Sequence, residues 1–225
     1  MFYSTPGASC TAARHLPSRH WRLEASLVTS GATLAIIAGG VGQRLGGVPK
    51  GLLVHQGRTL IERLLDLRHD FVEVLLVSGD RAYQSYGLRT IGDLVPGRGA
   101  PGGVHAALAK ANTPWVLAIG CDMPFVSPGA VQILLNARRA GTDWVCFEIA
   151  GRLEPLLGIY RSAIAPRWGR LLASQPSFAE LSRRFRHHLL PERRLREVDP
   201  ELRSVVSLNT PEDLHRFEVS LPTTL

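Results

Sequence analysis

The segment AIIAGGVGQRLGGVPKGLL, residues 35–53, has the composition of a strand that delivers its backbone to an anion. It passes from apolar residues into a stretch with six glycines, and it contains Arg44 and Lys50. Glycine lets main-chain N–H groups approach phosphate oxygens closely and adopts positive φ without steric cost. The two cations can neutralise the phosphates from the sides. The segment therefore predicts a phosphate-binding loop, and a flexible glycine turn with incidental cations is the alternative.

Two common phosphate loops do not fit this segment. The Walker loop, G-x-x-x-x-G-K-[ST], requires a glycine before its lysine and a hydroxyl after it, and Lys50 has neither. The dinucleotide fingerprint requires G-x-G-x-x-G, whereas the spacing from Gly40 to Gly46 is G-x-G-x-x-x-G. The acid expected about 20 residues later is also missing, since Asp80 lies about twice as far away. The loop instead has the longer form A-G-G-x-G-x-R-L-G-G-x-x-K.

Carboxylates follow two further apolar runs. In VLAIGCDMPF a predicted buried strand ends at Asp122, which would face the same crevice as the glycine loop. Mg²⁺ binds one or two carboxylates together with phosphate oxygens and water, so Asp122 is a candidate ligand; capping of the next turn is the alternative. Asp93 also follows a short strand, where nucleotide contact and loop capping fit the residues equally well. Cys121 has no neighbouring base and is predicted to be a packing residue.

Several of these segments together resemble the nucleotidyltransferases with a Rossmann-like core. Among them the sequence is most similar to the MobA-type molybdenum cofactor guanylyltransferases. The resemblance begins at the glycine loop and continues through IGDLVPGRGAPGGVHAAL, LAIGCDMPFVSP, RLEPLLGIYRSAI and SLNTPEDL, in family order over residues 32–217. It implies a three-layer α/β fold, with a mainly parallel sheet and helices on both faces.

The resemblance also implies a reaction and its residues. GMP would pass from GTP to the phosphate of molybdenum-bearing molybdopterin, with release of pyrophosphate and Mg²⁺ as cofactor. Arg44, Lys50 and Asp122 would be catalytic, Asp122 would bind the metal, and Asn209 would bind the acceptor. The nucleotide-binding residues would be Ile37, Ala38, Gly39, Gly40, Lys50, Ser78, Asp93 and Asp122. No activated nucleophile is needed, because the attacking phosphate oxygen is already ionised.

Two residues depart from the family pattern, so other nucleotides and acceptors are alternatives to GTP and molybdopterin. Ser78 stands where the family commonly has an asparagine that contacts the nucleotide, and Ser207 stands where a second asparagine is frequent. Cytidylyl transfer to molybdopterin or nucleotidyl transfer to a sugar 1-phosphate are therefore alternatives within the same class. A nucleotide- or cofactor-binding maturation factor without chemistry is the alternative from another class. The presence of Arg44, Lys50 and Asp122 favours an enzyme.

The hydrophobic pattern predicts strands that alternate with helices, which is typical of a parallel sheet covered on both faces. Strands are expected at 33–38, 72–77, 88–91, 115–120, 143–149 and 155–160. Helices are expected at 59–67, 102–112, 127–140, 161–173 and 177–189, and a last one begins after Thr210, with Asp213 completing a capping box. Residues 31–225 are predicted to form a single nucleotidyltransferase domain.

The remaining composition limits partners and location. Residues 1–30 are basic and aperiodic, and we expect a disordered extension or an upstream start; a transit peptide is the alternative. The charge of +7 favours anionic ligands, but no aromatic platform for nucleic acid is present. No 18-residue apolar run predicts a membrane span, and three widely spaced cysteines favour a reducing compartment, so a cytoplasmic location is expected. The basic segment 183–196 is predicted to be a solvated helix face, and transient contact with cofactor-insertion proteins or molybdoenzymes is also expected.

Overall fold

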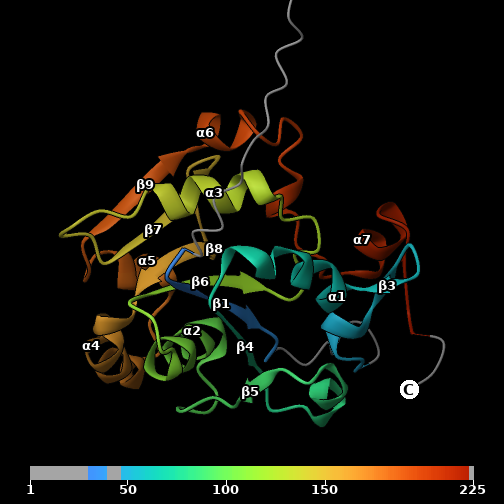
Figure 1. The fold of residues 1–225 in the computed structure, drawn as a ribbon, viewed down its shortest axis with the longest axis horizontal. Helices are drawn as coiled ribbons and strands as arrows, with labels where there is room; N and C mark the ends of the chain where they lie inside the picture. The colour runs from blue at the N-terminus through green and yellow to red at the C-terminus, as the bar shows by residue number, and fades with distance from the viewer. Residues whose placement is uncertain (1–29, 40–46, 223–225) are drawn as a thin grey trace, which may run out of the picture.

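The structure is a computed structural model that describes residues 30–39 and 47–222. Its centre is a seven-stranded sheet (Figure 1). In spatial order the strands are β5 (Arg89–Ile91), β4 (Glu73–Val77), β1 (Ala32–Ile37), β6 (Trp115–Gly120), β8 (Arg152–Arg161), β7 (Trp144–Ile149) and β9 (His187–Pro191). Neighbouring strands run parallel except where β8 pairs with β6 and β7. The mainly parallel sheet predicted from the sequence is confirmed.

Helices cover both faces of this sheet, as the alternation of side chains along β1 requires. Leu34 and Ile36 pack into one hydrophobic cluster, whereas Ala35 and Ile37 pack into another on the opposite face. The first face is covered by α1 (Leu60–Leu64), α3 (Pro128–Asn136) and α6 (Glu192–Arg196). The second is covered by α2 (Gly99–Lys110), α4 (Ala165–Leu171) and α5 (Phe178–Ser182) (Figure 1). This is the expected three-layer arrangement.

A small antiparallel sheet lies beside the main one and was not predicted. It contains β10 (Val219–Ser220), β2 (Val54–His55) and β3 (Arg58–Thr59), and α7 (Pro211–Arg216) precedes β10. Its hydrophobic cluster joins Leu53 and Leu60 to Leu208, so segments about 150 residues apart in the sequence pack together. The capping box predicted for α7 is confirmed, because Thr210 accepts from the Asp213 N–H and Asp213 accepts from the Thr210 N–H.

Short 3-10 helices complete the described elements. They are η2 (Lys50–Leu52), η3 (Leu65–Asp70), η4 (Arg81–Tyr86), η5 (Ser162–Ile164), η6 (Leu172–Ser174) and η7 (Arg203–Val205). The helix expected at 59–67 is divided between α1 and η3, and the one expected at 161–173 consists of η5, α4 and η6.

The helix predicted at 177–189 is wrong. Only α5 is helical, and the chain then enters β9, a strand parallel to β7 at the edge of the sheet. Asp143 fixes this connection, because its N–H donates to the Arg186 carbonyl at 2.7 Å and its carboxylate accepts from the Arg186 N–H at 2.9 Å. The basic segment 183–196 is therefore a turn, an edge strand and α6 rather than one helix face. Its contact with a partner stays a prediction.

Candidate active site

The carboxyl ends of β1, β4 and β6 lie side by side, which places their following loops at one edge of the sheet. Ile37 pairs with Val77 on one side and with Gly120 on the other. The next N–H groups continue this ladder, since Ala38 donates to the Val77 carbonyl at 2.8 Å and Cys121 to the Ile37 carbonyl at 3.0 Å. Ligands of open α/β sheets bind at this kind of edge. Two cavities open there, and Gly39 lines both of them.

The first cavity, which we call the Lys50 cavity, has a volume of about 410 Å³. Its walls come from β1, η2, β6, β8, the start of α2 and the loop after β5. The lining residues are Ile37, Gly39, Lys50, Asp93, Gly97, Gly99, Ala100, Gly103, Gly120, Cys121, Asp122 and Leu156. The many glycines expose main-chain groups rather than side chains to a ligand. This wall suits close approach by phosphate oxygens.

Lys50, Asp122 and Asn209 form one hydrogen-bonded group in this region. The Lys50 Nζ donates to Asp122 Oδ2 at 2.9 Å and to Asn209 Oδ1 at 2.5 Å. The Lys50 and Asp122 side chains are mostly buried, with 16% and 17% of their surface exposed. The structure thus brings together three residues predicted from separate segments of the sequence. It also shows that Lys50 and Asp122 bind each other.

The Asp122 side chain does not cap the helix that follows β6, which was the alternative to a role in the site. The N-cap of α3 is Ser127, whose side chain accepts from the Ala130 N–H, and the Asp122 carboxylate accepts from Lys50. Gly120 makes room for this carboxylate, because a Cβ at residue 120 would lie 2.7 Å from Asp122 Oδ1. A carboxylate at the end of a buried strand can therefore reach the cavity.

Asn209 is held by the carboxyl-terminal segment. Its Nδ2 donates to Ser207 Oγ at 2.9 Å, and its N–H donates to Asp213 Oδ2 at 2.8 Å. The Leu208 N–H donates to the Asp122 carbonyl at 2.9 Å, which ties this segment to the end of β6. The sequence indicated Ser207 only as a departure from the family pattern. In the structure its hydroxyl orients the Asn209 amide toward Lys50.

Asp93 lines the same cavity from the loop after β5. The pKa of its carboxyl is raised because the surrounding protein removes water from it. Its Oδ2 lies 4.0 Å from the point where a Cβ of residue 39 would stand, which places the carboxylate opposite the start of the glycine loop. Asp93 and Asp122 therefore face one cavity.

The start of α2 closes the Lys50 cavity. The N-cap residue Arg98 makes no side-chain hydrogen bond to the first turn of the helix, and Gly99 and Ala100 line the cavity. Free N–H groups at a helix start favour an anion. Gly103 lets α2 lie against β1, because a Cβ there would be 2.7 Å from Cγ2 of Ile37.

The second cavity, the Ser78 cavity, has a volume of about 470 Å³. It is lined by Ala38, Gly39, Gly47, Pro49, Ser78, Gly79, Asp80 and Arg81. Ser78 is buried at the end of β4, where its N–H donates to the Ile91 carbonyl at 2.8 Å. Its Oγ accepts from the Asp80 N–H at 3.0 Å.

Hydrogen bonds behind the cavities support Lys50. The Gly51 N–H donates to the buried hydroxyl of Tyr83 at 3.2 Å, and a Cβ at residue 51 would lie 2.8 Å from Cγ1 of Ile61. Sequence reasoning missed Tyr83, since a tyrosine in an irregular segment carries no signal of a partner distant in the chain. The sequence showed a glycine after Lys50, but it could not show that Ile61 leaves no room for a side chain at residue 51.

Other predictions from the sequence have mixed outcomes. Arg44 and Gly40 lie outside the described residues. Cys121 and Cys146 are buried free thiols, and burial raises the pKa of each to about 12, as expected of packing residues. Within residues 30–39 and 47–222, no group of three or more His, Cys, Asp or Glu residues could hold a metal ion. None of the helices in the same ranges is long and apolar enough to cross a membrane.

Comparison with known proteins agrees with this geometry. The family model of the MobA-like NTP transferase domain matches residues 34–191. The chain belongs to the MobA-like NTP transferase family. A probable molybdenum cofactor guanylyltransferase of Chloroflexus aggregans is 35% identical over 197 residues, which cover 84% of this chain and 94% of that protein. The molybdenum cofactor guanylyltransferase of Pseudomonas aeruginosa is 33% identical over 192 residues, covering 80% and 91%.

A solved structure extends the likeness to the fold of this MobA-like transferase. Molybdopterin-guanine dinucleotide biosynthesis protein A of Archaeoglobus fulgidus is 31% identical and superposes with a TM-score of 0.72, covering 83% of this chain and 96% of that one. The 2-C-methyl-D-erythritol 4-phosphate cytidylyltransferase of Thermus thermophilus is 23% identical, with a TM-score of 0.59, and shows the fold alone.

Proposed function

We propose that this MobA-like transferase moves GMP from GTP to the terminal phosphate of molybdenum-bearing molybdopterin and releases pyrophosphate. The observation that carries the proposal is the Lys50 cavity, which Lys50 and Asp122 line and where Lys50 donates hydrogen bonds to Asp122 and Asn209. The guanylyltransferase names of relatives at 33–35% identity support the choice of nucleotide and acceptor.

The residues of the cavity fit a magnesium ion, and we propose Mg²⁺ as cofactor. Asp122 would hold it, with Asp93 on the opposite wall, and phosphate oxygens and water would complete the coordination. Asp122 has a single side-chain partner in the described residues, the Nζ of Lys50, which a phosphate oxygen can replace. When bound, the ion would offset the negative charge of the triphosphate and of the leaving pyrophosphate.

The chain's own residues would align the reactants. An oxygen of the acceptor phosphate attacks the α-phosphorus of GTP, and the bond from that phosphorus to the β-phosphate oxygen breaks. Lys50 would transfer its hydrogen bond from Asp122 to the triphosphate. The first N–H groups of α2 would face the developing charge. Asn209, which lies against Lys50, would contact the acceptor phosphate.

Pyrophosphate release tests this function. The purified chain is incubated with molybdopterin, Mg²⁺ and one of GTP, CTP, ATP or UTP, and mass spectrometry identifies any dinucleotide product. We expect pyrophosphate only when GTP, acceptor and Mg²⁺ are all present. Turnover with CTP in place of GTP would assign the cytidylyl reaction instead. Binding of nucleotide without any acceptor-dependent pyrophosphate would support a non-catalytic maturation factor. Transient contact with proteins that receive the product stays a prediction.

A further inference from the structure

A third cavity is separate from the two already described. We call it the Arg203 cavity, and its volume is about 620 Å³. Its lining residues include His55 of β2, Arg63 of α1, Phe125 from the segment between β6 and α3, and Arg203 of η7. Among the described residues it shares no lining residue with the Lys50 cavity, so a ligand here goes beyond the proposed reaction. We propose that the Arg203 cavity binds a small phosphate monoester, with the phosphate group between Arg63 and Arg203.

Positive charge exceeds negative charge among the lining residues. They include three arginines and two carboxylates, which are Arg58, Arg63, Arg203, Asp66 and Asp199. Arg58 donates to the two oxygens of Asp66 at 2.8 and 2.9 Å, so these two charges compensate each other. In the part of the chain that the structure describes, Arg63 and Arg203 form no ion pair. These two guanidinium groups are therefore the ones available to an anion.

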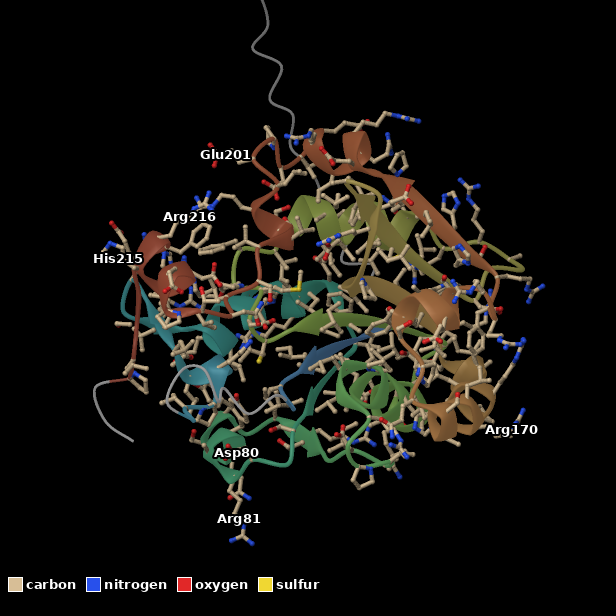
Figure 2. The ribbon with its side chains drawn as sticks, turned by 180° about the vertical axis from the view of Figure 1, so that it is seen from behind. Asp80, Arg81, Arg170, Glu201, His215 and Arg216 are labelled. Atoms are coloured by element: carbon tan, nitrogen blue, oxygen red, sulfur yellow. The ribbon has the colours of Figure 1, made fainter. Side chains whose placement is uncertain are left out.

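Main-chain contacts fix the turn that carries Arg203. Asp199 is buried, and its carboxylate accepts from the N–H groups of Arg203 at 3.1 Å and Ser204 at 2.6 Å. The Ser204 Oγ accepts from the Ser127 N–H at 3.0 Å, which ties η7 to the start of α3. Glu201 does not line the cavity, and Figure 2 shows its side chain extending outward at the edge of the molecule. The turn thus positions the guanidinium group at the cavity.

His55 shows that the two guanidinium groups act on one place. Its side chain is buried, and burial is the main cause of its lowered pKa. The charges of Arg63 and Arg203 lower this pKa further, whereas Glu218 raises it. The guanidinium carbon of Arg203 lies 4.7 Å from the centre of the Phe125 ring, and that ring meets His55 edge to face, with 5.3 Å between ring centres. Two cations from α1 and η7 thus act on the same side chain, and an anion beside them would offset their charge.

A phosphate group suits two guanidinium groups better than a carboxylate does. Each guanidinium has five N–H donors and often binds an anion through two of them. A carboxylate has two oxygens, which a single guanidinium can occupy. A phosphate monoester has three terminal oxygens, so it can accept from both groups at once. The pair Arg63 and Arg203 therefore favours phosphate.

An apolar wall favours an ester over free phosphate. The apolar lining residues are Leu67, Pro124, Phe125, Val126, Pro128 and Val198. The volume of about 620 Å³ lies in the range of small-ligand sites, roughly 300–1,000 Å³, and leaves room for more than a phosphate group. An organic group attached to the phosphate would bury apolar surface against this wall, which is favourable.

Equilibrium binding of phenyl phosphate, inorganic phosphate and benzoate, without nucleotide or acceptor, tests the inference. Calorimetric titration at constant ionic strength measures the affinities. We expect phenyl phosphate to bind most tightly, because inorganic phosphate lacks the apolar group and benzoate lacks the phosphate. Arg63→Gln and Arg203→Gln should each weaken phenyl phosphate binding roughly 10- to 150-fold, as expected for loss of a hydrogen bond between charged groups. Thermal unfolding checks that each variant folds.

Two controls separate this cavity from other cationic places. Arg68→Gln removes an exposed arginine of η3 that does not line the cavity, and Lys50→Ala removes the cation of the Lys50 cavity. We expect both to bind phenyl phosphate as the wild type does. The NMR signals of the His55 ring protons should also shift with phenyl phosphate in the wild type and in both controls.

Three results would overturn the inference. Loss of binding in Lys50→Ala, with wild-type affinity in Arg63→Gln and Arg203→Gln, would place the phosphate in the Lys50 cavity. Benzoate binding as tight as that of phenyl phosphate would reject phosphate as the recognised group, and equal affinity for inorganic phosphate would reject the ester. Because no turnover is measured, each of these results leaves the proposed GMP transfer to its own test.

Discussion

The Nζ of Lys50 lies 2.9 Å from Oδ2 of Asp122, across 72 residues of chain. Asp122 lies two residues beyond the end of β6, and Lys50 is the first residue of η2. Without a ligand, the positive charge of Lys50 and the negative charge of Asp122 compensate each other where both side chains are mostly buried. A nucleotide with a divalent ion offers both residues a new partner of opposite charge, so the ion pair holds the two side chains ready without a large reorganisation.

Replacement of Lys50 by alanine tests its role toward phosphate. If Lys50 stabilises the triphosphate, Lys50→Ala should reduce kcat/KM by the equivalent of about 2–4 kcal/mol of transition-state stabilisation while the chain still folds. Steady-state pyrophosphate release measures the rate, and thermal unfolding checks the fold. Lys110→Ala is the control, because it removes an exposed lysine at the last turn of α2. A wild-type rate in Lys50→Ala would favour the alternative interpretation, in which the glycine segment is a turn without a role in phosphate binding.

Replacement of Asp122 by asparagine separates charge from shape. Asn keeps a carbonyl oxygen for the Lys50 ammonium group but loses the negative charge that would hold Mg²⁺. We expect Mg²⁺-dependent turnover to fall by about two or more orders of magnitude, with Tm nearly unchanged. Activity over a magnesium titration and a melting curve are the two measurements. Normal activity per folded molecule together with lower stability would make Asp122 a structural residue and leave Asp93 as the metal ligand to test.

The layers of the fold could be predicted because their signal is local. Buried strands such as β1 and β6 are continuous apolar runs, and Thr210 with Asp213 marks the start of α7 within four residues. The strand β9 could not be predicted in this way, because arginines and histidines surround its apolar residues. It is a strand because its backbone pairs with β7, which is a contact distant in the sequence.

The sequence predicted which residues belong to the site, but not which of them contact each other. The glycine spacing and the strand end indicated Lys50 and Asp122 separately. Their ion pair joins residues 72 positions apart in the chain, and the contact from Asn209 depends on the carboxyl-terminal segment returning to the end of β6. Ser207 shows the same limit, since a serine between apolar residues has no pattern that predicts a hydrogen bond to Asn209.

Loss of the Tyr83 hydroxyl should loosen the support of Lys50. Tyr83→Phe leaves the buried Gly51 N–H without its acceptor, which costs about 1–3 kcal/mol of unfolding free energy. Since Gly51 directly follows Lys50, we also expect a higher KM for nucleotide. Tyr86→Phe is the control: its hydroxyl forms a hydrogen bond of 2.8 Å with the hydroxyl of Thr59, the N-cap of α1, so it should leave KM unchanged. Equal KM values in both variants would show that Tyr83 contributes to stability alone.

Glu73 controls an acid-sensitive part of the stability. It accepts hydrogen bonds from Thr33 Oγ at 2.7 Å and from the N–H and Nδ2 of Asn112, and it pairs with Arg89. Burial alone would raise the pKa of this carboxyl, but the hydrogen bonds from Asn112, Thr33 and Arg89 outweigh burial and lower it. The folded chain therefore binds fewer protons at Glu73 than the unfolded chain in the range just below the ordinary pKa of a glutamate.

The sign of the pH effect follows from that lowered pKa. The stabilisation from Glu73 is complete above the unfolded pKa, about 4.3, and is lost as pH falls toward the folded value. Glu73→Gln removes the ionised acceptor, so we expect it to lower the unfolding free energy at pH 7 by about 1–3 kcal/mol and to flatten its decline below pH 5. Urea unfolding from pH 7 to pH 3 measures both effects. Glu197→Gln, which changes an exposed carboxylate paired with Arg194, should keep the wild-type decline. If Glu73→Gln keeps it as well, the acid sensitivity arises from other carboxylates, and the contacts of Glu73 stabilise the fold independently of its charge.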